Sequence, residues 1–205
     1  MTATMERVRD VLANWPYPPD GGWTADDLDL LPQDGPHGEP DFFKRVELVD
    51  GALIFMSPQR RFHDLVIRRL ADVLDRQSPD DLTTATQMDL RLGPRQRPCP
   101  DAVVINASAA ADLSRTAYVS SEVRLVIEVV SPESEHRDRH VKPKIYANAG
   151  VEHFWLVEEE RGKPVIHTFQ LDPSAGEYGS TGAYRGQLKI EEPFPVNIDL
   201  ADLLQ

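Results

Sequence analysis

The sequence has only one cysteine, Cys99, among its 205 residues. A single thiol excludes an internal disulfide and cannot form a thiolate zinc site, so a bound metal would be held by carboxylates. The sequence also lacks the run of about 18 apolar residues that a membrane-spanning helix needs. Charged residues interrupt the first 15 positions, where a signal peptide requires an apolar stretch. We therefore expect a cytoplasmic protein that does not bind a membrane.

Positive charge is scarce. The 22 lysines and arginines face 34 aspartates and glutamates, which gives a formal net charge of −12. Nucleic-acid-binding proteins usually present a basic face, and an acidic field slows the approach to a phosphate backbone. This balance counts against tight, non-specific DNA binding, although a local basic groove or bound divalent cations would offset it. Glycine-rich phosphate loops of the Walker or dinucleotide type are absent as well.

The composition is otherwise that of an ordinary globular protein, with 40% apolar and 27% charged residues. The length suits one domain with a hydrophobic core. Residues 16–40 are rich in proline, glycine and aspartate, and they contain one short predicted helix, Thr24–Leu31, with Thr24 as its N-cap. We expect residues 1–40 to form an N-terminal helical and loop extension, and residues 41–205 to form the functional domain of a single globular protein.

Alternating polar and apolar residues on both sides of Asp50-Gly51 predict a β-hairpin, because this dipeptide favours a two-residue turn. Apolar residues at helical spacing predict an amphipathic helix over residues 60–77. Further strands are predicted at residues 83–92, 102–105, 123–130, 151–158 and 164–171, with short helices at 143–149 and 199–204. This order is typical of an α/β fold with a mixed central β-sheet flanked by helices.

Three acidic residues lie within or beside the predicted strands. Glu128 interrupts the apolar run VRLVIEVV, and an ionised carboxylate in a buried strand costs several kcal/mol unless it is paired or ligates a metal. Asp101 opens a strand directly after Pro100, and Glu47 lies in the first strand of the hairpin. The 27 positions that separate Asp101 from Glu128 are enough to put the two acids on neighbouring strands.

Lys142 stands directly before Pro143, at the start of a predicted helix. The residue before proline is biased to an extended conformation, so we expect Lys142 to be fixed at the mouth of the helix rather than on its face. Carboxylates are ligands that Mg²⁺ prefers, and a lysine beside them can assist an attacking water and stabilise charge on phosphorus. Taken alone, this combination is a weak signal, because α/β proteins commonly contain such residues.

Six segments follow one another in a recognisable order over roughly residues 24–171. They are RVELVDG (45–51), SPQRRFH (57–63), PDAVV (100–104), VIEVVSP (126–132), RDRHVKPKIYANAG (137–150) and VEHFWLV (151–157). Together they resemble the Uma family of putative restriction endonucleases, a branch of the PD-(D/E)XK nuclease superfamily. The resemblance implies a restriction-endonuclease-like core and a Mg²⁺- or Mn²⁺-dependent endonuclease that hydrolyses phosphodiester bonds, with DNA as its partner.

The resemblance also assigns roles to residues. Asp101 is similar to the metal-binding aspartate of the PD element, and Glu128 to the acid of the (D/E)XK element. The common pattern has a lysine two residues after that acid, where this sequence has Val130. In this family the lysine is displaced to the following helix, and Lys142 matches that place.

Two further ligands follow from the same resemblance. Glu47 matches the acid that precedes the core, which can ligate a second metal or a water, and the backbone carbonyl of Val129 would complete the metal shell. The expected catalytic residues are therefore Asp101, Glu128, Lys142 and Glu47, and the expected metal ligands are Asp101, Glu128, Val129 and Glu47. A homodimer is also expected, because cleavage of two strands often uses paired sites.

Simpler explanations stay open for several of these residues. One alternative is that Glu128 forms a structural ion pair with Arg137 or Arg139. Another is that Asp101, which follows a proline, is a turn or cap residue. Lys144, two positions beyond Lys142, is the rival site lysine.

Other residues and functions have alternatives as well. His63, near the start of a helix, is more typical of a structural residue, and Tyr146 and Trp155 are typical of core or site-wall aromatics. A non-catalytic binding module that keeps the nuclease fold is the first alternative function, which the net charge and the displaced lysine favour. A hydrolase of a smaller phosphoester is the second, because an acidic surface tolerates a small substrate better than long DNA.

Overall fold

A computed structural model of the chain describes residues 11–205 and divides them into two compact units. The first unit holds the described residues up to Ser57 together with Arg91–Cys99, and the second holds Pro58–Leu90 and Pro100–Gln205. The β-hairpin at Asp50-Gly51 therefore belongs to the first unit. The domain boundary expected between residues 40 and 41 stays a prediction.

The first unit contains helix α2 (Ala25–Leu28) and a hairpin of β1 (Val46–Val49) and β2 (Ala52–Phe55). Thr24 caps α2 as predicted, since its hydroxyl accepts from the Asp27 N–H and the Asp27 carboxylate accepts from the Thr24 N–H. The helix ends at Leu28, three residues before its predicted end. Asp50 and Gly51 have φ angles of 51° and 79°, the left-handed pair that a two-residue turn of type I′ requires.

Strand β1 is held on its other edge by the loop Arg91–Cys99. Leu48 and Arg97 exchange two backbone hydrogen bonds of 2.8 and 2.9 Å. Trp23, Ala25 and Leu48 form the buried centre of this unit. Because side chains alternate along a strand, Glu47 points away from the side of Leu48.

The second unit is built on a six-stranded sheet. From edge to edge its strands are β10 (Glu177–Tyr184), β9 (Lys163–Asp172), β8 (His153–Glu160), β7 (Val123–Val129), β5 (Ala102–Asn106) and β3 (Leu82–Thr86). Only β7 and β8 pair in parallel, while the other neighbours are antiparallel. The sheet is therefore mixed, as expected.

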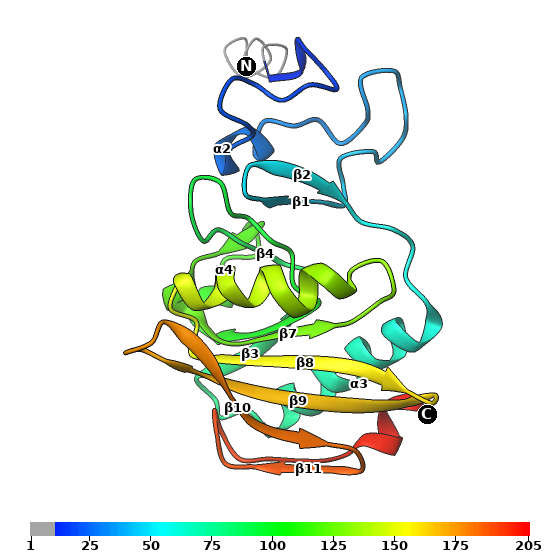
Figure 1. Cartoon of the computed structure of the whole chain (residues 1–205), viewed down its shortest axis with the longest axis vertical. Coiled ribbons are helices and arrows are strands. Elements are labelled where there is room, and N and C mark those ends of the chain that lie inside the picture. Colours follow the sequence, from blue (N-terminus) through cyan, green and yellow to red (C-terminus); the bar gives the residue numbers. More distant parts are fainter. Residues whose placement is uncertain (1–10) are drawn as a thin grey trace. The chain divides into compact units, whose positions relative to one another are not determined.

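Helices cover both faces of this sheet (Figure 1). Helix α3 (Arg61–Gln77) packs on one face, and helix α4 (Lys142–Asn148) lies against the other, where its Tyr146 ring approaches the Phe154 ring to 6.0 Å between centroids. The hydrophobic core under α3 includes Val66, Leu70, Leu74, Val104, Leu125, Ile127, Trp155 and Ile166. The α/β fold with a mixed central sheet flanked by helices is confirmed.

The remaining elements are short. They are β4 (Asp89–Leu90), paired in parallel with β6 (Ala117–Tyr118), the antiparallel pair β11 (Gln187–Ile190) and β12 (Val196–Asp199), and the 3₁₀ turns η1 (Ala109–Ala111), η2 (Ser120–Glu122) and η4 (Leu200–Leu204). The single strand predicted over residues 83–92 is wrong, because Gln87 takes a φ of 53° and breaks it into β3 and β4. Among the described residues, no helix combines the length and the apolar character needed to cross a bilayer.

The segment before α4 differs from the prediction. The helix is predicted to begin at residue 143, whereas residues Arg137–Val141 form a turn of π-helix (η3) that runs directly into α4. Lys142 has φ −59° and ψ −42°, so its expected extended conformation is wrong. Its N–H donates to the carbonyl of Arg137, five residues back. A π-turn is wider than an α-turn, and it lets a helical residue precede Pro143 despite the usual bias.

Candidate functional site

Asp101 and Glu128 lie on neighbouring strands of the second unit. Strands β5 and β7 pair Ala102 with Ile127, so the same register, continued by one residue, places Asp101 opposite Glu128. Directly opposite residues have side chains on the same face of a sheet. This face is the one that α4 covers, and Glu128 is only 1% exposed there.

Asp101 is fixed by two contacts to the same oxygen. Its Oδ2 accepts a hydrogen bond of 2.7 Å from the Val129 N–H, and the Nε2 of His63 lies 3.2 Å from it. His63 comes from the first turn of α3 and is buried. Both contacts use Oδ2, and among the described residues none donates a hydrogen bond to Oδ1 of Asp101.

Glu128 is held from helix α4. The Nζ of Lys142 lies 3.1 Å from both of its carboxylate oxygens, and the Tyr146 hydroxyl donates to Oε1 at 2.5 Å. Lys142 is also buried, and it lies 3.5 Å from Asp138 in η3. Asp138, Lys142 and Tyr146 thus follow one another at intervals of four residues along one helix face.

Sequence reasoning missed three of these contacts. The sequence predicts a structural role for His63 and a core or site-wall role for Tyr146, and it assigns no role to Asp138. The four-residue spacing of Asp138, Lys142 and Tyr146 is the signal that would have shown a shared helix face. It was hidden because Pro143 was expected to start the helix.

The donor set fits a divalent cation. Asp101 and Glu128 are buried carboxylates at opposite positions of β5 and β7, and the buried ammonium of Lys142 contacts both Glu128 and Asp138. Buried carboxylates need positive charge nearby, and oxygen ligands are those that Mg²⁺ and Mn²⁺ prefer. The residues that would hold such an ion are Asp101, through Oδ1, and Glu128.

The structure separates the two rival lysines. Lys142 contacts Glu128, whereas Lys144 is exposed on another side of α4. Arg139, one of the expected structural partners of Glu128, instead pairs with Glu158 at 2.8 Å and with Glu135 at 3.3 Å.

Glu47 and Val129 complete the predicted set. Glu47 belongs to the first unit, where it is 1% exposed and accepts a hydrogen bond of 3.2 Å from the Cys99 N–H. Val129 ends β7, with its side chain in the core and its N–H on Asp101. The structure therefore brings Asp101, Glu128, Lys142 and the Val129 backbone together in the second unit. The role of Glu47 stays a prediction.

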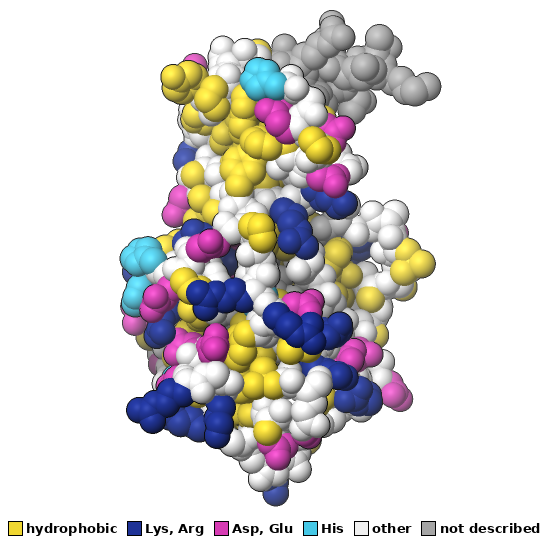
Figure 2. Space-filling view, turned by 90° about the vertical axis from the view of Figure 1, so that its right-hand side faces the viewer, with side chains coloured by type: hydrophobic (Ala, Val, Ile, Leu, Met, Phe, Trp, Pro, Cys, Tyr) yellow, Lys and Arg dark blue, Asp and Glu magenta, His cyan; other side chains and the backbone are white. Residues whose placement is uncertain are grey.

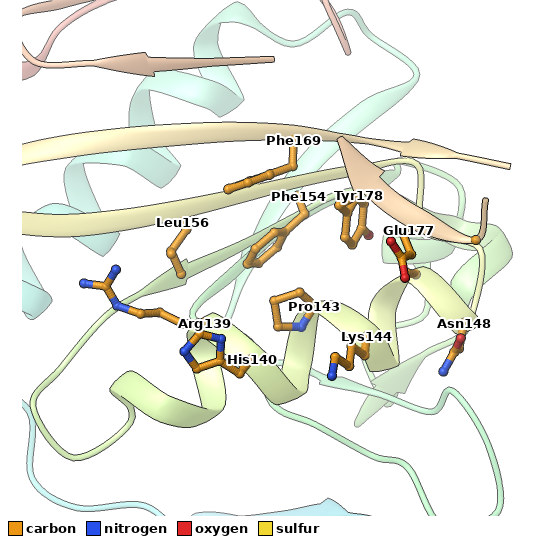
Figure 3. Close-up of a pocket in the computed structure, with 12 residues that line it drawn as sticks. Arg139, His140, Pro143, Lys144, Asn148, Phe154, Leu156, Phe169, Glu177 and Tyr178 are labelled. Atoms are coloured by element: carbon orange, nitrogen blue, oxygen red, sulfur yellow. The ribbon is translucent and has the colours of Figure 1, made fainter. Parts of the chain in front are cut away.

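A pocket of about 580 Å³ lies on the side of α4 next to β8, β9 and β10 (Figure 3). Arg139, His140 and Lys144 bring basic groups to it, and Phe154, Phe169 and Tyr178 form an aromatic wall. Burial raises the pKa of the Tyr178 hydroxyl, which donates to the Val151 carbonyl at 2.7 Å. The pocket does not include Asp101, Glu128 or Lys142, so it is a neighbouring cavity rather than the site itself.

The surface charge is mixed. On the face shown in Figure 2, lysine and arginine side chains lie interspersed with aspartate and glutamate side chains and do not form one continuous basic field. This agrees with the net charge of −12. Any attraction to a polyanion would therefore be local.

Comparisons with known proteins agree with this fold. The sequence model of the family described as "Uma2: Putative restriction endonuclease" matches residues 39–202. The crystal structure of a putative nuclease belonging to DUF820, from Anabaena variabilis ATCC 29413, has a similar fold, with a TM-score of 0.64 and 14% sequence identity over 88% of this chain and 97% of that chain. No curated protein matches the sequence. The match to the family model covers most of the chain and confirms the resemblance carried by the sequence motifs, so this chain belongs to the Uma2 family of putative restriction endonucleases.

Proposed function

We propose that this protein is a Mg²⁺- or Mn²⁺-dependent endonuclease that hydrolyses phosphodiester bonds in DNA. The observation that carries the proposal is the buried placement of Lys142 at 3.1 Å from Glu128, with Asp101 opposite Glu128 on the neighbouring strand. A lysine and two carboxylates on one sheet face match the chemistry of metal-assisted phosphoester hydrolysis. Membership in a family of putative restriction endonucleases supports the same reaction class.

Each residue has a separate task in this proposal. A bound divalent cation supplies charge stabilisation at the phosphate and lowers the pKa of water. Asp101 and Glu128 would hold that cation, with the Val129 carbonyl as a third protein ligand. Lys142 orients the attacking water and stabilises the negative charge that grows on the phosphate oxygens.

Neighbouring groups fix this geometry. The Val129 N–H and His63 hold one oxygen of Asp101, which leaves the other directed to the cation. Tyr146 holds Glu128 through its hydroxyl. Asp138 lies 3.5 Å from Lys142 and helps to hold its ammonium beside Glu128. Glu47 as a further acid, and a homodimer as the cutting unit, remain parts of the prediction.

A cleavage assay tests the proposal. Wild type is incubated with supercoiled plasmid DNA and Mg²⁺ or Mn²⁺, beside Asp101→Asn and the matched surface control Asp112→Asn. Asp112 is exposed and contacts Ser114 in its own turn. We expect wild type and Asp112→Asn to nick or cut the DNA equally, and Asp101→Asn to lose on the order of 10³-fold in rate.

Three outcomes contradict the proposal in different ways. Metal-dependent cleavage that survives both Asp101→Asn and Glu128→Gln places the chemistry elsewhere. Binding of labelled DNA in Ca²⁺ without cleavage in Mg²⁺ or Mn²⁺ identifies a binding module. Hydrolysis of bis(p-nitrophenyl) phosphate without cleavage of DNA identifies a hydrolase of smaller phosphoesters.

A further inference from the structure

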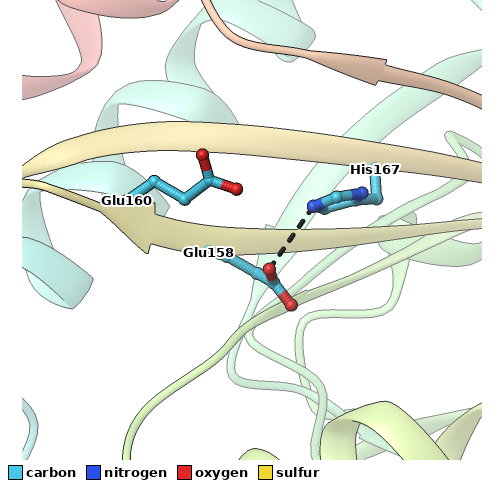
Figure 4. Close-up of side chains that lie close together, drawn as sticks. All are labelled: Glu158, Glu160 and His167. Carbon is cyan, nitrogen blue, oxygen red and sulfur yellow. Dashed lines mark ion pairs between the residues drawn. The ribbon is translucent and has the colours of Figure 1, made fainter.

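A second group of ligand-type side chains lies at the far end of the β8–β9 hairpin. Glu158 and Glu160 come from β8 and His167 comes from β9, and one ligand atom from each lies within 4.8 Å of the other two (Figure 4). Two-residue alternation puts Glu158 and Glu160 on the same face of the strand. His167 pairs with Leu156, so it lies diagonally beside Glu158 on that face.

The buried atoms of this cluster are poorly satisfied. Glu158 is only 9% exposed, and its Oε1 is in an ion pair with Arg139 at 2.8 Å, whereas the buried Nε2 of His167 has no hydrogen-bond partner among the described residues. The His167 Nε2 lies 3.4 Å from Glu158 Oε2, which is long for a hydrogen bond. Buried polar atoms without a partner are rare in folded proteins, and a bound ion is one established reason for them. Figure 4 shows the imidazole of His167 directed at one carboxylate oxygen of Glu158.

Two arginines contact the carboxylates of the cluster. Arg185 holds both oxygens of Glu160 at 3.0 Å, which keeps the pKa of Glu160 below its usual range and the carboxylate ionised at neutral pH. Arg139 contacts Glu158 through Oε1 only. A carboxylate offers about four lone-pair sites, so an arginine and a metal can share one. The Arg185–Glu160 pair is exposed and therefore weak enough to rearrange.

Solvent and ions can reach the cluster. A surface hollow of about 690 Å³ is lined by Glu160, Arg161, Lys163, Val165 and Arg185. Arg161 and Gly162 form the turn between β8 and β9 with φ angles of 52° and 76°. The ligands therefore sit on a rigid two-residue hairpin with an open approach from its tip.

We infer that Glu158, Glu160 and His167 bind a divalent transition-metal cation, Zn²⁺, with solvent in the remaining position. One imidazole nitrogen and two carboxylates form a three-ligand set that suits Zn²⁺, whose sites use nitrogen as well as oxygen. Mg²⁺ prefers oxygen ligands alone and gains little from His167. The set thus differs in chemistry from Asp101 and Glu128.

This site is distinct from the proposed catalytic one. Glu128 pairs with Leu156, and Leu156 pairs with His167, so Glu128 and His167 lie in one row across β7, β8 and β9. Neighbouring strands are about 4.8 Å apart, which separates the two residues by roughly 10 Å. The two ions of a two-metal hydrolase lie only about 4 Å apart. The Zn²⁺ would therefore join β8 to β9 rather than take part in hydrolysis.

Calorimetric titration with Zn²⁺ in the presence of excess Mg²⁺ tests the inference. Wild type is compared with His167→Gln and Glu160→Gln, and with Glu159→Gln as the matched control. Glu159 is an exposed neighbour on the same strand that points to the opposite face. We expect one Zn²⁺ per chain in wild type and in Glu159→Gln, and affinity at least tenfold weaker in His167→Gln and Glu160→Gln.

Two further variants locate the ion. Asp101→Asn should keep the Zn²⁺ affinity, and so should the double variant His136→Gln/His140→Gln, which removes a histidine pair with ring centroids 5.3 Å apart. Loss of binding in either variant, with binding kept in His167→Gln, moves the ion elsewhere and overturns the inference. Absence of Zn²⁺ binding in wild type overturns it too, since the cluster then holds only water.

Thermal unfolding provides an independent readout. Zn²⁺ at about 100 times its Kd should raise the Tm of wild type by several degrees, because the ion binds only the folded chain. His167→Gln should match wild type in EDTA and lack the rise. If that variant is unstable in EDTA, the exposed Glu160→Gln carries the same comparison. An equal Tm rise in wild type and in both variants contradicts the site.

Discussion

Two clusters of acids share one face of the same sheet, yet they differ in every partner. Asp101 and Glu128 lie under helix α4, and their neighbours are a lysine, a tyrosine hydroxyl and a backbone N–H. Glu158 and Glu160 lie at the end of β8, and their neighbours are a histidine and two arginines. The comparison shows that the same residue type on the same face acquires different chemistry from the element packed above it.

The difference follows from burial and from ligand type. Lys142 is buried and held within the cluster, so its charge is available where the substrate phosphate would lie. Arg185 is 60% exposed, and its charge is screened by solvent and salt. The first cluster therefore suits a catalytic role with an oxygen-bound ion, and the second suits a structural ion with nitrogen and oxygen ligands.

The largest change in cleavage and stability is expected for Lys142→Met, which keeps the length of the side chain and removes its charge. This variant tests whether the Asp101 and Glu128 cluster depends on a buried cation. Catalytic efficiency should fall by about 10²–10³-fold, because the growing charge on phosphate loses its cation. Unfolding without metal should become easier by about 3–5 kcal/mol, because Glu128 loses its buried partner. Plasmid cleavage and denaturant unfolding, each with and without Mn²⁺, measure the two changes.

The control for this prediction is Lys144→Met, on the exposed side of α4. It should leave cleavage and stability nearly unchanged. Mn²⁺ should raise the Tm of Lys142→Met more than that of wild type, since the ion then replaces the missing positive charge. If Lys144→Met reduces cleavage as much as Lys142→Met does, Lys144 is the site lysine and the contrast between the clusters fails.

Much of the first cluster was readable from sequence because each signal was local. The acid in VRLVIEVV and the proline before Asp101 both depend on neighbours in the chain. His63 was not identified, because its approach to Asp101 depends on how α3 packs on the sheet. Lys142 was found by family resemblance. Its helical conformation depends on a π-turn, which the spacing of residues in the sequence does not predict.

The second cluster was hidden by one element boundary. The strand after Gly150 was expected to end at Glu158, whereas β8 continues to Glu160 and pairs it with Lys163. With that two-residue turn at Arg161-Gly162, the register places His167 beside Glu158. Hairpin register therefore decides whether distant acids and histidines meet, and an error of two residues in a strand end conceals the cluster.

A smaller effect is expected for Tyr146→Phe, which keeps the ring packed near Phe154 but removes the donor to Glu128. Cleavage should fall by about tenfold and the free energy of unfolding by about 1.5 kcal/mol, because a hydrogen bond to a charged group is lost. Tyr178→Phe is the matched control, since it loses a hydrogen bond to the Val151 carbonyl outside the site.

The two tyrosine variants separate stability from catalysis. Tyr178→Phe should lose a comparable amount of stability and keep full cleavage under conditions where both proteins are folded. Zn²⁺ binding should be unchanged in both. Equal cleavage by Tyr146→Phe and wild type would show that Lys142 alone positions Glu128. Tyr146 would then not be part of the catalytic site.

The smallest effect concerns a histidine outside both clusters. His153 begins β8 and is buried, and burial lowers its pKa below the usual 6.5, although Glu152 and Glu192 partly oppose this shift. The unfolded chain therefore binds this proton more readily than the folded chain does. As the pH falls below 6.5, the free energy of unfolding should decrease, by about 1 kcal/mol for each unit of pKa difference.

Chemical denaturation between pH 5 and 8 measures this slope in wild type, in His153→Gln and in the exposed control His37→Gln. Only His153→Gln should have a shallower loss of stability below pH 6.5, whatever its stability at pH 8. Added Zn²⁺ should leave the His153 contribution unchanged, because Glu152 and Glu192 act on His153 as nearby charges and, among residues 11–205, form no three-ligand group with it. The contrary result is that wild type and His153→Gln lose stability equally steeply below pH 6.5. That result would show that burial of His153 has no effect on stability, and that His153 and His167 differ only in the carboxylates near them.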